Sequence, residues 1–169
     1  MVPANNSMKE FLLTMRIAYF SWKGHTEKVV TALARLLDAE LVRIEPLRES
    51  GMPGKLLKTL FFMKSAIKPC PTDLTGSDGL IIATPVWAAK VPPYVNEYLA
   101  EVSGGEGKPF HVIAEMGGRG SEGTIAAVRK ELERKGMRFG SSATTIERDV
   151  DSGTFMATVE AFAAGIRRK

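Results

Sequence analysis

The 169-residue sequence contains one cysteine, two histidines and no long apolar run. The single Cys70 excludes a disulfide within the chain. No apolar stretch approaches the ~20 residues that a membrane-spanning helix needs. The segment Phe11-Leu12-Leu13 is too short for the core of an export signal. We therefore expect a cytoplasmic protein without a transmembrane segment, in which residues 1–14 form a short N-terminal lead and residues 15–169 form one domain.

The chain also lacks a strong excess of one charge, since 23 Lys and Arg face 19 Asp and Glu. The basic residues are mostly mixed with acids, and no aromatic and basic platform accompanies them. We therefore expect no nucleic-acid partner. No Gly-Lys-Ser/Thr follows the first predicted strand, which argues against a P-loop nucleotidase. The same strand ends in Ser21-Trp22 rather than in the acids that a metal-binding receiver domain needs.

Apolar segments alternate with amphipathic ones along the whole chain. The predicted strands are residues 15–20, 40–45, 79–84, 110–115 and 138–146, and helices are expected at about 26–37, 55–67, 93–102, 122–135 and 153–166. This alternation predicts an α/β sandwich of three layers, with helices on both faces of a five-stranded parallel sheet. Ligands bind at the carboxyl ends of such strands, so the loops after the first, third and fourth strands are the candidates for function.

The loop after the first strand reads Ser21-Trp22-Lys23-Gly24-His25-Thr26. Its hydroxyls, glycine and lysine lead directly into a predicted helix. Backbone N–H groups and the helix dipole favour an anion at such a position, so the loop predicts a phosphate site. The alternative is a plain turn in which Thr26 caps the helix.

The loop after the third strand carries Trp87 behind Pro85. A tryptophan held there is a candidate surface on which a flat ligand stacks, and the alternative is a ring folded into the core. The loop after the fourth strand, residues 116–123, is rich in glycines that let a ligand approach the backbone. Residues 118–123 also fit G-x-G-x-x-G, but the dinucleotide fingerprint belongs to the first strand-helix turn of its unit, so we discount this match.

Together these loops resemble the flavodoxin family. The phosphate loop of that family has the form [ST]-x-T-G-x-T, which Ser21, Gly24 and Thr26 match while Lys23 replaces the usual Thr. The segment from Asp78 to Trp87 is similar to the third strand and flavin-contacting loop of the family. The resemblance implies the strand order 2-1-3-4-5, the short-chain form and one bound FMN.

The resemblance also implies the cofactor contacts. The phosphate would be held by the first loop, the isoalloxazine would meet the loop after the third strand, and its other side would be bordered by the loop after the fourth. The corresponding residues are Ser21, Trp22, Lys23, Gly24, His25 and Thr26, then Thr84, Pro85, Val86 and Trp87, then Met116, Gly117, Gly118 and Arg119. A positive charge at Arg119 would favour the anionic reduced flavin and raise the redox potential.

Three functions fit these features of the sequence. The first is an FMN-binding electron-transfer flavoprotein that serves redox protein partners. The second is an FMN-dependent NAD(P)H:quinone-type reductase of a small molecule, and the third is a binding module without flavin. We find no Ser-His-Asp set, metal cluster or carboxylate pair, and therefore name no catalytic residue. His111, in an apolar strand, is expected to be structural, and Cys70 is either an idle thiol or a redox group.

The predicted helix 55–67 is the candidate partner surface. Lys55, Lys58, Phe62 and Ser65 share the face opposite its apolar stripe. An aromatic among lysines suits an acidic redox partner, a second copy of the chain in a homodimer, or an anionic membrane surface. The alternative is a solvated face with Phe62 tucked under the loop of residues 46–54.

Overall fold

The structure is a computed structural model that describes residues 13–47 and 66–168. Its centre is a five-stranded parallel sheet in the order β2-β1-β3-β4-β5. The strands are β1 (Met15–Tyr19), β2 (Glu40–Arg43), β3 (Gly79–Pro85), β4 (Pro109–Met116) and β5 (Arg138–Ile146). The predicted fold class and strand order are confirmed.

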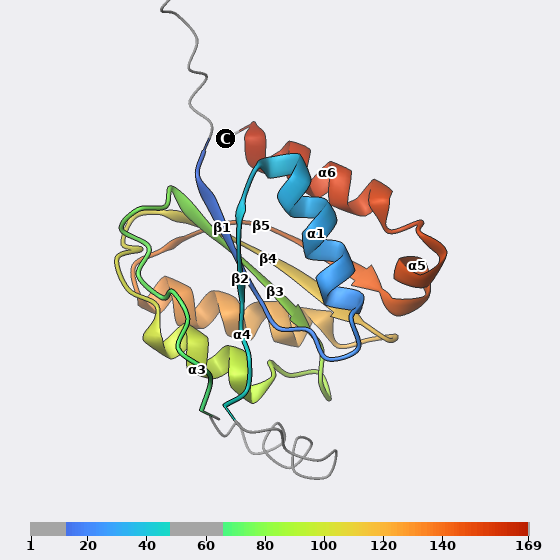
Figure 1. Cartoon of the computed structure of the whole chain (residues 1–169), viewed down its shortest axis with the longest axis horizontal. Helices are drawn as coiled ribbons and strands as arrows, with labels where there is room; N and C mark the ends of the chain where they lie inside the picture. Colours follow the sequence, from blue (N-terminus) through green and yellow to red (C-terminus); the bar gives the residue numbers. More distant parts are fainter. Residues whose placement is uncertain (1–12, 48–65, 169) are drawn as a thin grey trace, which may run out of the picture.

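Helices cover both faces of the sheet. Figure 1 shows α1, α5 and α6 on one side and α3 and α4 on the other. Their bounds are α1 (His25–Leu37), α3 (Pro93–Glu101), α4 (Ser121–Arg134), α5 (Glu147–Ser152) and α6 (Met156–Arg167). The carboxyl ends of β1, β3 and β4 therefore open at one edge of the sheet, where each strand leads toward its helix.

Two apolar layers hold the helices on the sheet. The central strand β3 is buried along its whole length and supplies both layers, because successive side chains point to opposite faces. Ile81 packs with the α1 and α6 side, and Ile82 packs with the α3 and α4 side. Because β3 is packed on both faces, it holds the start of the following loop in a fixed position at the carboxyl edge of the sheet.

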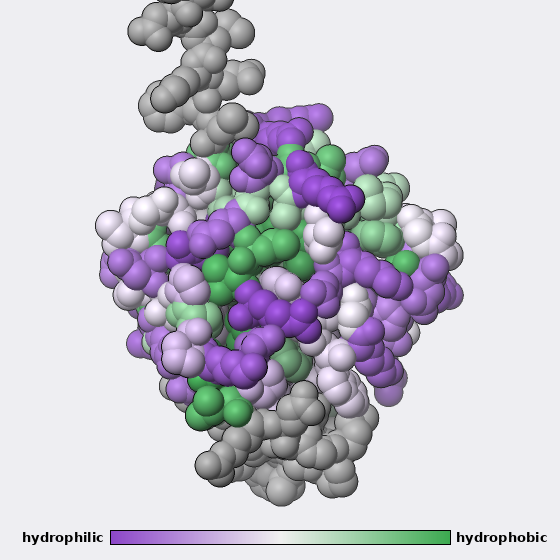
Figure 2. Space-filling view, viewed as in Figure 1, coloured by the Kyte–Doolittle hydropathy of each residue, from purple (hydrophilic) through white to green (hydrophobic). Residues whose placement is uncertain are grey.

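β2 forms one edge of the sheet and has one solvent-exposed face, as the alternation of polar and apolar residues in its sequence predicts. Only Val42 of this strand is buried, and Leu41 is 39% exposed. In the view of Figure 2, hydrophilic residues cover most of the molecule and hydrophobic surface gathers in a strip near the centre. Among the described residues, no helix is long and apolar enough to cross a bilayer.

The helix predicted over residues 153–166 is present as α6, which begins at Met156, and a separate short helix, α5, precedes it. α5 ends at Ser152, Gly153 follows in the left-handed conformation at φ 82°, and α6 begins at Met156. A glycine reaches this conformation without the steric cost of a Cβ, which is why the chain turns there. The turn leaves Glu147 as the first residue of a short helix that the sequence did not indicate.

The predicted helix over residues 55–67 lies mostly outside the described residues, and with it the surface of Lys55, Lys58, Phe62 and Ser65. Its predicted last residue, Ile67, is not helical but bridges to Pro46 in an antiparallel pair. The second strand, expected to reach Glu45, ends at Arg43, although the N–H of Ile44 still donates to the carbonyl of Tyr19 at 2.7 Å.

His111 is buried in β4, in agreement with the expected structural role. Its Nδ1 lies 2.8 Å from the hydroxyl of Ser141 on β5. Gly140 lies beside the ring, and a Cβ there would sit 2.3 Å from its Cε1 atom. The weak strand former Gly140 is therefore required for the close packing of this imidazole.

Candidate functional site

A pocket of about 140 Å³ opens at the carboxyl edge of the sheet. Its walls come from the turn before α1, the loop after β3, the end of β4 and the start of α5. Most of the residues expected to bind a cofactor line it, namely Ser21, Trp22, Lys23, His25, Thr26, Pro85, Val86, Trp87 and Gly117. The structure therefore brings together residues of all three loops that the sequence singled out.

Five expected residues do not line this pocket. Thr84 is fully buried and donates its hydroxyl to the carbonyl of Pro85 at 3.0 Å. Gly24 acts through its backbone, as the residue that precedes α1. Met116 is the last residue of β4, and Gly118 and Arg119 lie exposed in the loop that follows it. The roles expected for Arg119 and its neighbours stay predictions.

The turn before α1 presents an open helix N-terminus. Gly24 is the N-cap residue in the left-handed conformation, at φ 92°, and as a glycine it has no side chain with which to cap the helix. The first N–H groups of a helix have no partner within the helix and must find one outside it. Ser21 meets one such need by accepting from the N–H of Glu27 at 3.3 Å. The remaining end of the helix, with Lys23 exposed beside it, suits an anion.

Two tryptophans stand at the mouth of the pocket. Trp22 is 39% exposed and Trp87 is half-buried, with their ring centroids 5.6 Å apart at 73°. Trp87 also meets Phe20 edge to face at 5.5 Å and Tyr94 at 6.4 Å. It therefore combines the two roles considered for it, because one part packs on the core while another lines the pocket.

A strained turn holds Trp87 in place. The backbone N–H of Trp87 donates to Lys90 and the N–H of Lys90 donates back, at 3.1 and 2.9 Å. Ala88 and Ala89 between them adopt φ of 49° and 58°. Positive φ at both central residues is the geometry of a type I′ turn, which glycine and asparagine usually supply. Such a conformation costs an alanine about 1–2 kcal/mol.

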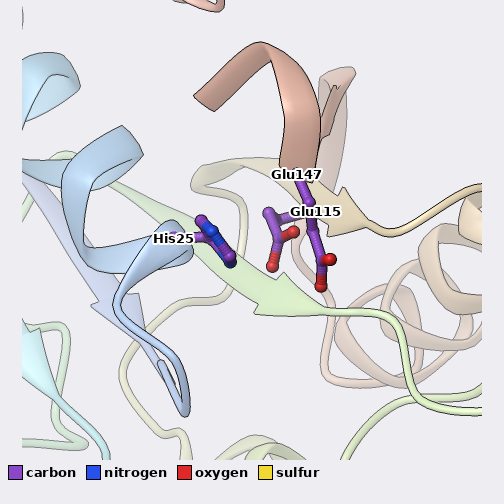
Figure 3. A group of neighbouring side chains, drawn as sticks. All are labelled: His25, Glu115 and Glu147. Carbon is purple, nitrogen blue, oxygen red and sulfur yellow. The ribbon is translucent and has the colours of Figure 1, made fainter. Parts of the chain in front are cut away.

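The pocket is also lined by three titratable groups (Figure 3). His25 comes from the start of α1, Glu115 from the end of β4 and Glu147 from the start of α5, and their side chains point toward one another. One nitrogen or oxygen from each residue lies within 4.8 Å of the corresponding atoms of the other two. Glu115 is only 5% exposed. Burial, followed by the nearby charge of Glu147, raises the pKa of the Glu115 carboxyl, while His25 and the hydroxyl of Thr26 act against this shift.

The carboxylate pair of Glu115 and Glu147 was not predicted from the sequence. One signal was present, because Glu115 is an acid at the carboxyl end of an otherwise apolar central strand. The position of Glu147 beside Glu115 depends on α5, a helix that no periodicity in the sequence indicates. A contact between residues so far apart in sequence follows from the pairing of β4 with β5 and not from any local pattern.

Cys70 lies away from the pocket and is half-buried against the core on the α3 and α4 side. Burial raises the pKa of its thiol. A raised pKa lowers the fraction of reactive thiolate, which supports the idle thiol among the two roles considered.

Comparison with known proteins gives a family and a set of structural relatives. Residues 17–149, well over half of the chain, match the family described as NADPH-dependent FMN reductase. A flavoprotein of Lactobacillus acidophilus NCFM, solved in complex with FMN, aligns with a TM-score of 0.68 at 16% identity over 84% of this chain and 99% of its own. A flavodoxin of Megasphaera elsdenii aligns with a TM-score of 0.59 at 16% identity over 89% of this chain and 99% of its own.

The comparison with curated proteins gives no significant match. At these identities the structural relatives establish only the fold, and the family match establishes the family. The expected resemblance to flavodoxin-like proteins is confirmed, and the family agrees with the expectation of FMN as cofactor. The chain belongs to the NADPH-dependent FMN reductase family and has a flavodoxin-like fold.

Proposed function

We propose that the chain binds FMN at the carboxyl edge of its sheet and oxidises NADPH there. The observation that carries the proposal is the union of an open helix N-terminus with two tryptophans in one pocket. A flavin nucleotide has an anionic end and a flat end, and the two halves of this pocket match them. The family match supports the nicotinamide as the electron donor.

The residues of the turn fit a phosphate. The hydroxyls of Ser21 and Thr26, the ammonium of Lys23 and the first N–H groups of α1 are donors of the kind that a phosphate accepts. Gly24 has no Cβ, so it adopts the αL conformation without strain and lets the chain turn sharply into the helix. A Cβ built at this position would meet no other atom within 4 Å.

The aromatic side fits one edge or face of a ring system. The pocket of about 140 Å³ is smaller than the roughly 300–1,000 Å³ of sites that enclose a drug-sized ligand. It therefore encloses only part of a flavin nucleotide, and the remainder would lie at the mouth beside Trp22. The turn at Ala88 and Ala89 fixes Trp87 before any ligand arrives, which reduces the entropy lost on binding.

FMN supplies the redox chemistry when it is bound, because it accepts a hydride from a nicotinamide and passes electrons on. The chain's own residues bind and orient. Val86 keeps the loop in register by donating its N–H to the carbonyl of Glu115 at 2.8 Å, which ties the loop after β3 to the end of β4. The two loops that would flank the ring are thus held together by the sheet.

Electron transfer to a redox protein partner, the function expected first from the sequence, is the second candidate. The observation in its favour is the exposure of Trp22 at the pocket mouth, since a ring beside it would be within reach of a docked protein. The two candidates differ in what they need. A reductase consumes NADPH by itself, whereas a carrier is reduced only through a partner.

The experiment is anaerobic mixing of the FMN-loaded chain with NADPH, followed by flavin absorbance. Rapid bleaching without any second protein supports the reductase. Bleaching only after a reductase protein is added supports the carrier. A chain that stays colourless in excess FMN contradicts both.

A further inference from the structure

The cluster of His25, Glu115 and Glu147 has no role in the function proposed above. It lines the same pocket as the tryptophans, and two of its three members are acidic although the expected ligand is an anion. Two carboxylates beside a phosphate would repel it unless something positive lay between them. The cluster therefore needs its own explanation.

Glu115 is the most unusual member of the cluster. Its side chain is more than nine-tenths buried, its Oε1 atom has no hydrogen-bond partner among the described residues, and its Oε2 accepts only a long bond of 3.5 Å from Thr26. A buried carboxylate without partners is strongly unfavourable, and buried charges in proteins are paired or coordinate metals. Glu115 is one of the residues that line the pocket, so its carboxylate borders the space in which a ligand would lie.

His25 has the hydrogen-bonding pattern of a metal-binding histidine. Its Nε2 lies 3.0 Å from the Oδ1 of Asp151, while its buried Nδ1 has no partner within the part of the chain that the structure describes. When Nε2 carries the proton and donates it to Asp151, Nδ1 keeps a free lone pair. A carboxylate on the far nitrogen that fixes the tautomer and ring orientation is the usual outer partner of a ligating histidine.

We propose that His25, Glu115 and Glu147 bind a divalent transition-metal ion of the zinc class. One imidazole with two carboxylates is a donor set of mixed nitrogen and oxygen type, which suits Zn²⁺ better than Mg²⁺ or Ca²⁺. Three protein ligands leave a fourth position open toward the pocket, as in zinc sites that also hold a small ligand.

The geometry requires only a small movement. Ligand atoms around a tetrahedral zinc ion lie roughly 3.4 Å apart when each is about 2.0–2.2 Å from the metal. The three atoms here already lie within 4.8 Å of one another. Glu147 is half-buried at the start of a short helix, so its side chain can supply the approach by a change of rotamer.

The test measures zinc on the full-length chain without added FMN, so that it does not depend on the proposed function. Equilibrium dialysis against Zn²⁺ and thermal unfolding with and without Zn²⁺ are compared among the parent chain and single variants. The variants are Glu115→Gln, Glu147→Gln and Asp151→Ala. Glu122→Gln, which changes an exposed carboxylate in the first turn of α4, is the matched control.

The proposal expects one zinc ion per parent chain and a higher unfolding midpoint with zinc. It expects binding to fall at least tenfold in Glu115→Gln and in Glu147→Gln. In Asp151→Ala binding falls about 10-fold to 100-fold, because the outer partner of the histidine is lost. Glu122→Gln binds zinc as the parent does.

Two results would overturn the proposal. One is a parent chain that binds no zinc under these conditions. The other is zinc binding that survives in both Glu115→Gln and Glu147→Gln, since the ion would then be held elsewhere on the chain. Neither result bears on FMN, which is measured separately with the parent chain.

Discussion

Two groups of residues at the pocket, called here its aromatic side and its titratable side, are built in opposite ways. On the aromatic side, Trp87 packs against Phe20, Tyr94 and Trp22, so the rings support one another without a ligand. On the titratable side, atoms of His25 and Glu115 are buried without hydrogen-bond partners among the described residues. The rings of the aromatic side thus pack on one another, with the buried hydroxyl of Tyr94 unpartnered among the described residues. The titratable side leaves both a ring nitrogen and a carboxylate oxygen unsatisfied at the pocket. Truncation of a ring on the aromatic side should accordingly lower the free energy of unfolding, whereas neutralising Glu115 on the titratable side should raise it wherever that carboxyl is ionised.

The largest effect is expected for Trp87→Ala. Removal of a large side chain that packs on three other rings should lower the free energy of unfolding by about 2–3 kcal/mol, less than for a fully buried tryptophan. Trp22→Ala, at the more exposed ring of the pair, should lower it by no more than about 1 kcal/mol. Denaturant titration of both variants measures the difference. Equal losses would show that the two rings do not differ in their support of the fold.

The next effect is expected for Gly24→Ala. The added Cβ meets open space, so only the left-handed backbone resists it, and the free energy of unfolding should fall by about 1–2 kcal/mol. Gly165→Ala in α6 is the control, because it also meets open space but sits in a helix with negative φ, where alanine should add about 1 kcal/mol. A gain in both variants, measured by chemical denaturation, would contradict the assigned conformation of Gly24.

A smaller change with the opposite sign is expected for Ala89→Gly. Glycine adopts φ of 58° without strain, so the turn after Trp87 should gain about 0.5–1 kcal/mol in stability. The same substitution in a regular helix, Ala127→Gly in α4, should lose about 1 kcal/mol. Thermal unfolding of the two variants reports the signs, and a loss at position 89 would mean that the turn is not strained.

The smallest effect concerns pH on the titratable side. The pKa of Glu115 is raised in the folded chain, so its protonated form favours folding. Its contribution is fully present below the ordinary pKa of a glutamate, near 4.5, and is lost as the pH rises through the raised folded value. The slope for one proton is at most about 1.4 kcal/mol per pH unit.

Glu115→Gln should flatten the stability profile above about pH 4.5, measured by urea unfolding at a series of pH values in EDTA. Glu122→Gln should leave the profile as it is, since that side chain is exposed. An unchanged slope in Glu115→Gln would show that the carboxyl is solvated in the folded protein.

The fold was readable from the sequence because its signals are local. The strand at Gly79–Pro85 is apolar throughout, and the turns at Gly24 and Gly136 mark the start of one helix and the end of another. The last predicted helix is present as α6 with a later start. The helix α5, which Gly153 separates from α6, is too short to leave a periodicity in the sequence. The sequence around Gly140 is weak for a strand, because the glycine is required by the ring of His111 on the neighbouring strand and not by any local pattern.

Only part of the site could be predicted from the sequence. Ser21, Gly24 and Trp87 lie in loops with recognisable turn chemistry, and the structure places two of them in the pocket wall and the third at the helix start. The pairing of Glu115 with Glu147 is a long-range contact, set by the packing of α5 against the end of the sheet. Such a contact has no signature in either segment alone.

The central claim is that the open end of α1 holds the phosphate of FMN while the ring lies beside the tryptophans. The chain contains only two tryptophans, and both line the pocket, so its intrinsic tryptophan fluorescence reports on this site alone. Titration of the parent chain with FMN and with riboflavin is the most direct test. We predict quenching by both flavins, with riboflavin binding at least roughly tenfold more weakly, or about 1.4 kcal/mol, because it lacks the phosphate. Equal affinities for the two flavins, or no quenching by FMN, would contradict the account.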